Sequence, residues 1–296
     1  MKLIHKHPMI MIVIGVIGIS LSSIFVKYSA APSPVTAAFR LLWTVVLMTP
    51  TVLVKHSIRA EIRGMGRRRL GLSILSGVFL ALHFWTWFES LMHTSVASST
   101  TIVCTEVIWV SLGYWLFMRG RLSIKAVIAI GVTLIGSVMI AFSDSMAGGN
   151  HLYGDMLALI AAVTVAIYVL LGKSVRSSVS TTAYTYVVYI SCAAVLLAVC
   201  LAQGHALFAY GISAVIVGLL LAVFSTILGH SIFSWCLKYF SPSFVSASKL
   251  CEPVVASVLS ALLFAEMPMP LQIAGGILII GGVLYYSRIE SSGKTG

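Results

Sequence analysis

The chain has 296 residues, of which 59% are hydrophobic and 9% are charged, and its mean hydropathy is +1.04. Soluble domains carry roughly 25% charged residues, so this composition excludes an ordinary water-soluble protein and predicts an integral membrane protein. The net charge of +11 would suit nucleic-acid binding, but the positions of the basic residues, described below, argue for a membrane cause.

Ten apolar segments are long enough to cross a hydrocarbon core about 30 Å thick, which takes about 20 helical residues. They cover residues 8–29, 34–54, 70–91, 95–117, 123–142, 154–172, 180–202, 211–237, 243–265 and 268–287. The first follows Lys2 and Lys6 as a signal peptide would, but it exceeds the usual length of about 7–15 apolar residues, so we expect it to stay as a membrane helix. The sequence predicts an all-α membrane protein with ten transmembrane helices.

Lysine and arginine are concentrated in every second connection between these segments and at the two termini. All but three of the 19 lie there, the exceptions being Lys27, Arg40 and Lys249. Cytoplasmic loops of membrane proteins carry an excess of Lys and Arg. This pattern predicts that both termini are cytoplasmic, and that the protein is a multi-pass protein of the bacterial plasma (inner) membrane. The positive charge is thus explained by basic residues that orient the protein in the lipid bilayer, and the pattern predicts no nucleic-acid partner.

Two glutamates interrupt apolar segments. Glu106 lies in segment 95–117, and Glu252 lies in segment 243–265, 146 residues later (252 − 106). Each is roughly 15 Å along its helix at a rise of 1.5 Å per residue, near the middle of the bilayer. A membrane span carries such charge where it has a function or a partner.

The two halves of the chain end alike. Residues 131–138 read GVTLIGSV and residues 276–283 read GILIIGGV, each following a segment with a central glutamate. Division near Gly149 gives five segments per half, and an odd number makes the second half enter the membrane from the opposite side. We therefore predict two inverted five-helix repeats, residues 1–148 and 149–296, a layout typical of secondary transporters with a midplane binding site.

Several motifs, taken in order, resemble the EamA-type family of the drug/metabolite transporter superfamily over essentially the whole chain. The residues that carry the resemblance are Pro34-Val-Thr-Ala-Ala-Phe39-Arg40, Leu82-His83-Phe84, Thr94-Ser95-Val96-Ala97-Ser98, Gly229-His230-Ser231, Trp235-Cys-Leu-Lys238-Tyr239, Glu252-Pro253-Val254 and Ala265-Glu266. The resemblance implies ten helices in two inverted repeats around a central cavity that moves small metabolites, commonly outward, and relatives include amino acid exporters. The sequence departs from the family where Gly120-Arg121 stands at the position matching Ala265-Glu266.

Glu252 and Lys249 form one candidate pair for substrate binding or proton coupling. Pro253 removes a backbone donor beside the glutamate and frees a carbonyl, which favours a functional site at a broken helix. The alternative is a structural ion pair with Lys249, which lies three residues earlier on nearly the same helix face.

Glu106 and Trp109 are also three residues apart, so a carboxylate and an indole would share a face. Such a pair suits a substrate with a cationic amine, through charge and cation–π contact. The alternative is a carboxyl group hydrogen-bonded to a neighbouring helix, with the indole as packing.

The segment 70–91 carries His83 and Trp87, which are four residues apart and share a helix face. His83 could relay protons or hydrogen-bond a neighbouring helix, and His230 is a weaker candidate of the same kind. Arg40 could bind a substrate carboxylate, but snorkelling or an ion pair with Glu89 is the favoured interpretation. Tyr168 is a candidate for lining the cavity.

The favoured function is a secondary transporter that exports small metabolites, most simply amino acids or related amphipathic compounds. The sequence has no P-loop for ATP, no HExxH metal motif and no GxSxG elbow, so we expect neither an enzyme nor a cofactor or metal site. The alternatives left open are an intramembrane enzyme, a retinal receptor using Lys249 and a passive metabolite facilitator. Proton coupling and a homodimer are also left open.

Overall fold

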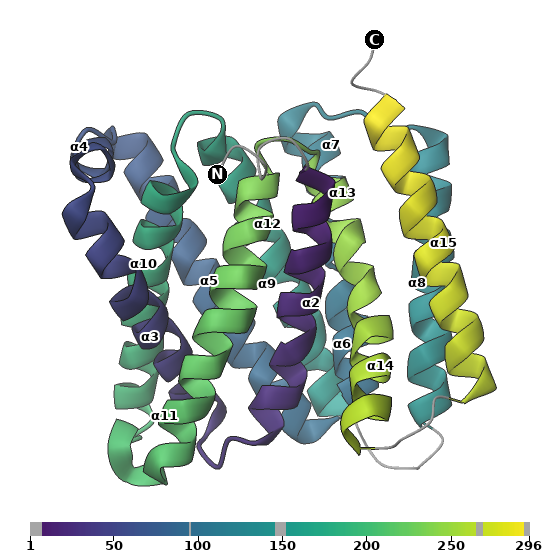
Figure 1. Cartoon of the computed structure of the whole chain (residues 1–296), viewed down its shortest axis with the longest axis horizontal. Helices are drawn as coiled ribbons and strands as arrows, with labels where there is room; N and C mark the ends of the chain where they lie inside the picture. The colour runs from purple at the N-terminus through teal and green to yellow at the C-terminus, as the bar shows by residue number, and fades with distance from the viewer. Residues whose placement is uncertain (1–7, 95, 146–151, 265–268, 293–296) are drawn as a thin grey trace.

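The computed structural model describes residues 8–94, 96–145, 152–264 and 269–292, and in these ranges the chain is helical and contains no strand (Figure 1). The helices are α2 (Pro8–Lys27), α3 (Ser33–Val54), α4 (His56–Arg63), α5 (Arg67–His93), α6 (Val96–Cys104), α7 (Glu106–Met118), α8 (Ile124–Ser145), α9 (Leu152–Arg176), α10 (Thr181–Ala202), η1 (Leu207–Tyr210), α11 (Gly211–Leu220), η2 (Leu221–His230), α12 (Ser231–Cys236), α13 (Pro242–Ser248), η3 (Lys249–Cys251), α14 (Glu252–Phe264) and α15 (Pro270–Ser292). The predicted repeat boundary at residues 148–149, and the motif residues Ser95, Ala265 and Glu266, lie outside the described residues.

Eight helical stretches among the described residues are long and apolar enough to cross a membrane. They are Pro8–Lys27, Ser33–Val54, Arg67–His93, Ser98–Met118, Leu152–Arg176, Thr181–Ala202, Leu207–Cys236 and Pro270–Glu290. A shorter apolar stretch covers Ile124–Ile140. The fold is therefore that of an all-helical, multi-pass membrane protein, while the count of ten transmembrane helices and the cytoplasmic placement of the termini stay predictions.

Lipid explains both the helices and their apolar surface. A chain in hydrocarbon must satisfy every backbone N–H and C=O internally, which an α-helix does within one segment. Large apolar side chains cover the outside of the bundle as well as its core; Phe117 is 83% exposed and Val54 is 81% exposed. Such exposure would be unfavourable in water and is expected in contact with lipid tails.

Three of the predicted segments are not continuous α-helices. The segment predicted at 95–117 divides at Thr105 into α6 and α7, and the one at 243–265 contains the 3-10 turn η3 between α13 and α14. The segment at 211–237 contains η2, a ten-residue π-helix. π-Helical segments inside α-helices occur frequently at functional sites.

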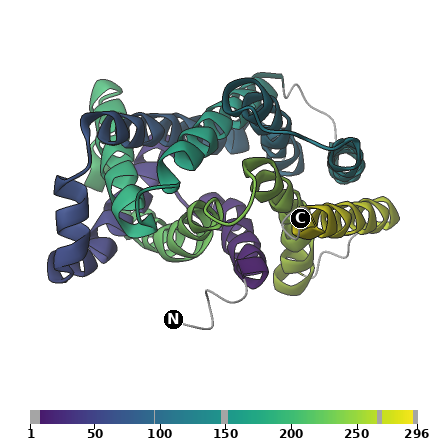
Figure 2. The same cartoon turned by 90° about the horizontal axis from the view of Figure 1, so that it is seen from above.

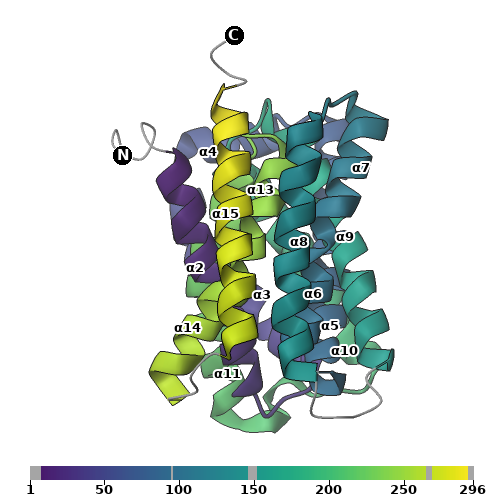
Figure 3. The same cartoon turned by 90° about the vertical axis from the view of Figure 1, so that its right-hand side faces the viewer.

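Helices α8 and α15 pack against each other at one side of the bundle, as the views from above and from the side show (Figures 2 and 3). Glycine permits the close approach. A Cβ atom at Gly136 would lie 2.6 Å from the carbonyl oxygen of Gly275 and 3.1 Å from the backbone nitrogen of Ile279. Gly136, one of the two glycines in residues 131–138, is therefore a point of close helix packing.

A second contact in the same interface has matching spacing. A Cβ atom at Gly282 would lie 3.1 Å from the carbonyl oxygen of Ala129 and 3.3 Å from the backbone nitrogen of Thr133. An offset of 146 relates the two contacts: it converts Gly136 into Gly282, and it converts Ala129 and Thr133, which Gly282 approaches, into positions 275 and 279, which Gly136 approaches. The packing therefore equates Gly136 with Gly282, one residue later than the sequence motifs suggest, and at the same offset as the two glutamates.

Candidate functional site

A cavity lies inside the bundle between helices from the two halves of the chain. It holds about 370 Å³ of space between protein atoms, counting the part that is open to the outside. Its polar and aromatic lining comprises Ser22, Arg40, His83, Trp87, Glu106, His230, Lys249 and Glu252, and its aliphatic lining comprises Ile19, Val103 and Val165. Six of the eight predicted site residues therefore line one cavity, although they come from distant parts of the sequence.

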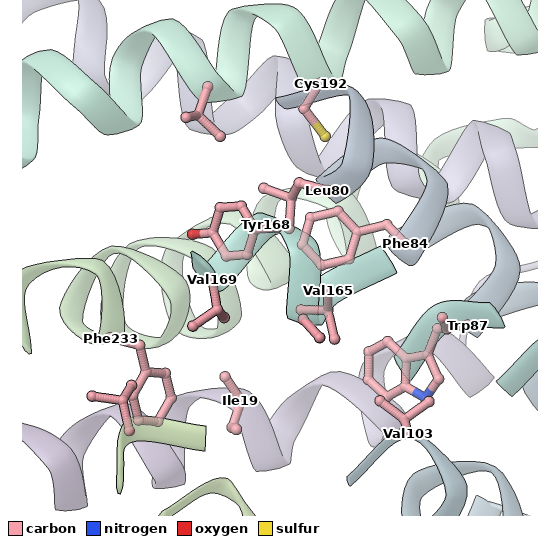
Figure 4. Close-up of a cluster of buried hydrophobic side chains, with 14 of the residues drawn as sticks. Ile19, Leu80, Phe84, Trp87, Val103, Val165, Tyr168, Val169, Cys192 and Phe233 are labelled. Atoms are coloured by element: carbon pink, nitrogen blue, oxygen red, sulfur yellow. The ribbon is translucent and has the colours of Figure 1, made fainter. Parts of the chain in front are cut away.

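The aliphatic walls of the cavity belong to the hydrophobic core. Figure 4 shows Trp87 beside Val103 at one end of this buried cluster and Phe233 at the other, with Ile19 and Val165 between them. The cluster places apolar surface around the charged lining, so the charges lie in a region of low effective dielectric constant. Charges in such a region interact strongly with one another and with any bound ligand.

Both glutamates stand at a discontinuity in their helix. Glu106 is the first residue of α7, directly after the turn at Thr105, and Glu252 is the first residue of α14, directly after η3. Pro253 has no N–H to donate to the carbonyl of Lys249, and the thiol of Cys104 contacts that oxygen at 3.8 Å. A negative side chain at a helix N-terminus is stabilised by the helix dipole, so each break creates a position that favours a carboxylate.

Lys249 forms its ion pair with Glu106, not with Glu252. The Nζ atom of Lys249 lies 2.9 Å from Oε1 of Glu106, and both side chains are buried. The intrahelical pair between Lys249 and Glu252, which the spacing of three residues suggested, is therefore wrong. Residues 143 positions apart in the chain neutralise each other, and they join α7 to η3.

Glu252 is left without this partner. Its side chain is 7% exposed and lines the cavity, and its Oε1 atom has no hydrogen-bond partner within the described part of the chain. Leaving a buried charged acceptor unsatisfied carries a large desolvation penalty. A carboxylate at this position therefore disfavours folding when no ligand is bound. A ligand that donates a hydrogen bond, or a proton, would satisfy the oxygen.

Arg40 is fully buried, with no exposed surface. Its Nε atom donates to Thr226 Oγ1 at 2.7 Å, and one terminal nitrogen donates to Ser22 Oγ at 3.2 Å. The guanidinium carbon lies 3.9 Å from the ring centroid of Phe84. The other terminal nitrogen, Nη2, has no partner among the residues described.

The favoured interpretation of Arg40 is thus wrong on both counts. The side chain does not snorkel, because it is buried in the bundle. It also does not pair with Glu89, which contacts His93 at 3.2 Å one helical turn away. Arg40 lines the cavity, is held by neutral groups and keeps one buried donor without a partner among the described residues, so the alternative of a carboxylate-binding residue stays a prediction.

His83 and Trp87 share a helix face, as their spacing predicts. Their rings stack with centroids 5.9 Å apart and an interplanar angle of 12°. The Nδ1 atom of His83 lies 3.0 Å from the carbonyl oxygen of Ala161 on α9, which matches the expectation of a bond to a neighbouring helix. The indole Nε1 of Trp87 is buried and has no acceptor among the described residues.

His230 and Thr226 enter the site through the π-helix η2. His230 is its last residue and lines the cavity with an unpartnered Nδ1, and Thr226 orients Arg40. Sequence reasoning ranked His230 low and missed Thr226 and Ser22. Hydropathy carries no signal for a π-helix or for small hydroxyl residues that face inward, so only the motif Gly229-His230-Ser231 pointed to this region.

Tyr168 lies near the cavity but does not line it. Its hydroxyl group bonds Ser234 Oγ at 2.8 Å, and its ring centroid is 6.2 Å from that of His230. Tyr168 therefore packs against His230, a residue of the cavity wall, without lining the cavity itself.

Trp109 is not brought to the cavity. Its side chain is 37% exposed on the outer surface, whereas Glu106, Val107 and Val110 are buried. At about 100° per residue, the buried arc of α7 is centred between Val107 and Val110, and Trp109 lies outside it. The expected pairing of Trp109 with Glu106 at a substrate site is therefore wrong.

No group of three or more His, Cys, Asp or Glu side chains that could hold a metal ion was found in the residues the structure describes.

Comparisons with known proteins agree with this architecture. A protein described as an uncharacterized transporter from Clostridium kluyveri is 22% identical over 205 residues, a match that spans 67% of this chain and 66% of the relative's length. A solved crystal structure superposes with a TM-score of 0.78 at 15% identity, over 97% of this chain and 98% of that one, which shows a shared fold. The EamA-like transporter family matches residues 7–142 and again residues 152–288. The chain therefore belongs to the EamA-like transporter family.

Proposed function

We propose that this protein is a secondary transporter of the bacterial inner membrane that exports small metabolites, amino acids or related amphipathic compounds. The observation that carries the proposal is a cavity lined by Arg40, Trp87, His230 and Glu252, each of which has a buried polar atom without a partner among the described residues. Buried polar atoms are nearly always hydrogen-bonded in folded proteins. Four such atoms around one cavity, in a chain of a transporter family, point to a small polar ligand that enters and leaves.

The proposal includes two inverted repeats, residues 1–148 and 149–296, that rock against each other around the cavity. Three features support it. The family matches the chain twice, both glutamates begin a helical segment after a break, and the contacts of Gly136 and Gly282 share the glutamates' offset of 146. Discontinuous helices at the interface of inverted repeats are where transporters hold substrates and coupling ions.

Proton coupling, as part of this proposal, belongs to Glu252. Glu106 is already neutralised by Lys249 at 2.9 Å, whereas Oε1 of Glu252 accepts no bond from the described residues. A proton can reach a free carboxylate without breaking an ion pair. In an exporter, a proton that binds Glu252 from outside and leaves it inside would drive the substrate outward.

The test is flux in proteoliposomes of a labelled amino acid panel, with and without an imposed pH gradient. We expect saturable flux that the gradient accelerates, and a Glu252→Gln variant whose flux no longer follows the gradient. Glu89→Gln, which neutralises a carboxylate outside the cavity, is the matched control and should behave as the wild type. Saturable flux that ignores the gradient in the wild type would make the protein a facilitator. No saturable flux for any member of the panel would refute amino acids as the substrates.

A further inference from the structure

The cavity contains four charged side chains whose formal charges cancel, but only two of them pair with each other. Lys249 and Glu106 form an ion pair at 2.9 Å. Arg40 and Glu252 line the same cavity, and no ion pair joins them in the described structure. The cavity lining therefore includes one cation and one anion that form no ion pair with each other or with another described residue.

The free donor of Arg40 is held in place before any ligand arrives. Thr226 and Ser22 fix two nitrogens of the guanidinium group, and the ring of Phe84 supports its face at 3.9 Å. These contacts are neutral, so the positive charge is not compensated by them. A guanidinium group fixed in this way, with Nη2 still able to donate, suits a carboxylate, because charge-assisted bonds between the two groups are strong and geometrically specific.

The free acceptor of Glu252 is complementary. Its cationic neighbour in sequence, Lys249, is engaged by Glu106, so that lysine does not supply the missing ion pair. An ionised carboxylate accepts hydrogen bonds only, and an ammonium group donates three. Glu252 is therefore suited to bind an ammonium group of a ligand.

The remaining wall fits an uncharged group, because it holds no further unpaired charge and its polar atoms without a partner, Nε1 of Trp87 and Nδ1 of His230, belong to neutral rings. Val103, Val165 and Ile19 provide aliphatic surface, and the stacked rings of His83 and Trp87 provide aromatic surface. A charged ligand side chain would find no partner on that surface, because both cavity charges that lack partners are used by the ligand's own two ends. Burial of a third charge without a partner would be costly.

We propose that this cavity recognises zwitterions with an uncharged side chain, with the ligand's carboxylate on Arg40 and its ammonium group on Glu252. The inference rests on the proposed transport function and deepens it, because it assigns each end of the ligand to one residue and requires both charges on one molecule. Ligands with only one of the two charges leave either Arg40 or Glu252 buried and unpaired.

The experiment compares matched triplets that share one side chain. The first is leucine, 3-methylbutylamine and 4-methylpentanoate; the second is phenylalanine, 2-phenylethylamine and 3-phenylpropionate. Binding to the purified full-length protein is measured by ligand-dependent thermal stabilisation and by competition against labelled leucine. We expect each zwitterion to bind about tenfold to hundredfold more tightly than either partner of its triplet, because a charged hydrogen bond left unmade costs about 1.5–3 kcal/mol.

Two variants then test the assignment. In Glu252→Gln the preference for leucine over 4-methylpentanoate should disappear, while the preference over 3-methylbutylamine persists. In Arg40→Lys, which keeps the charge but loses the planar fork, the preference over 3-methylbutylamine should fall, while the preference over 4-methylpentanoate persists. A merely structural role would weaken all three ligands together, so the crossed pattern separates recognition from misfolding.

The wild-type comparison alone keeps the proposal falsifiable if a variant fails to fold. Equal binding of the zwitterion, amine and acid would overturn the proposal, as would uniform loss in both variants. Saturable transport that does not discriminate within a triplet would refute this inference and leave the transport function intact. Absence of transport for every substrate tried would refute the function itself.

Discussion

The ion pair of Lys249 and Glu106 should be a stabilising element of the fold as well as part of the cavity wall. Removing one partner from a buried pair leaves an uncompensated charge, which typically costs about 3–5 kcal/mol. We expect Glu106→Gln and Lys249→Met each to lower the unfolding midpoint of the purified protein strongly. The double variant should be less destabilised than the sum of the single variants, because it leaves neither charge alone.

The exposed pair of Glu89 and His93 provides the comparison within the same molecule. Its atoms lie 3.2 Å apart, but the side chains are 33% and 44% exposed, so solvent screens the interaction. Surface pairs contribute about 1 kcal/mol or less, and Glu89→Gln should barely move the midpoint. If the Glu106 and Lys249 variants combined additively, the buried pair would contribute no coupling energy and this account would be wrong.

At the residue scale, the sequence reveals residue types that are rare in apolar segments, but it does not reveal which residues they pair with. A buried Arg, Lys or Glu in an apolar segment is conspicuous, so Arg40, Glu106, Lys249 and Glu252 were all found. Their partners were not, because spacing along one helix reveals only neighbours three or four residues away. The pairing of Lys249 with Glu106 spans two distant segments, which no single-helix pattern can predict.

At the element scale, the packing of α8 on α15 depends on the absence of side chains at two positions. An added methyl group at Gly136 or Gly282 would meet backbone atoms of the opposite helix, which cannot rotate away as a side chain could. We expect Gly136→Ala and Gly282→Ala to destabilise the protein by about 1–3 kcal/mol, the usual cost of overpacking. Unfolding midpoints of the purified variants measure this.

Neighbouring glycines in the same helices supply the controls. A Cβ at Gly131 in α8 or at Gly281 in α15 would meet nothing within 4 Å. Gly131→Ala and Gly281→Ala should therefore be neutral, or stabilising through the higher helix propensity of alanine. Equal effects at all four positions would show that the close approach of the two helices does not limit stability.

Element boundaries followed from hydropathy, but interruptions within elements did not. The segment predicted at 34–54 is α3, and the one at 180–202 is α10, each within one residue. The turn at Thr105, the 3-10 turn at Lys249–Cys251 and the π-helix η2 were not predicted, apart from the effect of Pro253 on its neighbour. Apolar content sets where a chain crosses hydrocarbon, whereas a change in hydrogen-bond pattern inside a helix arises from tertiary contacts.

For the whole molecule, the arrangement of chain ends supports one orientation. The start of α2, the end of α15 and the basic helix α4 all lie at the same end of the bundle (Figure 1). The loop between α10 and η1 lies at the opposite end and contains no lysine or arginine. Since cytoplasmic loops are enriched in basic residues, we expect the α4 end to face the cytoplasm.

Thiol labelling of introduced cysteines tests this orientation in intact cells. Ser57 in α4 and Gln203 after α10 are both exposed, whereas four of the five native cysteines are buried and Cys251 is partly buried. A membrane-impermeant maleimide should label Gln203→Cys in intact cells and should label Ser57→Cys only after permeabilisation, with the wild type setting the background. The reverse labelling pattern would show that the protein has the opposite orientation in the membrane. Because Arg40 and Glu252 would keep their places in the cavity, the recognition of ligand would be unchanged, but the same transport cycle would then run inward.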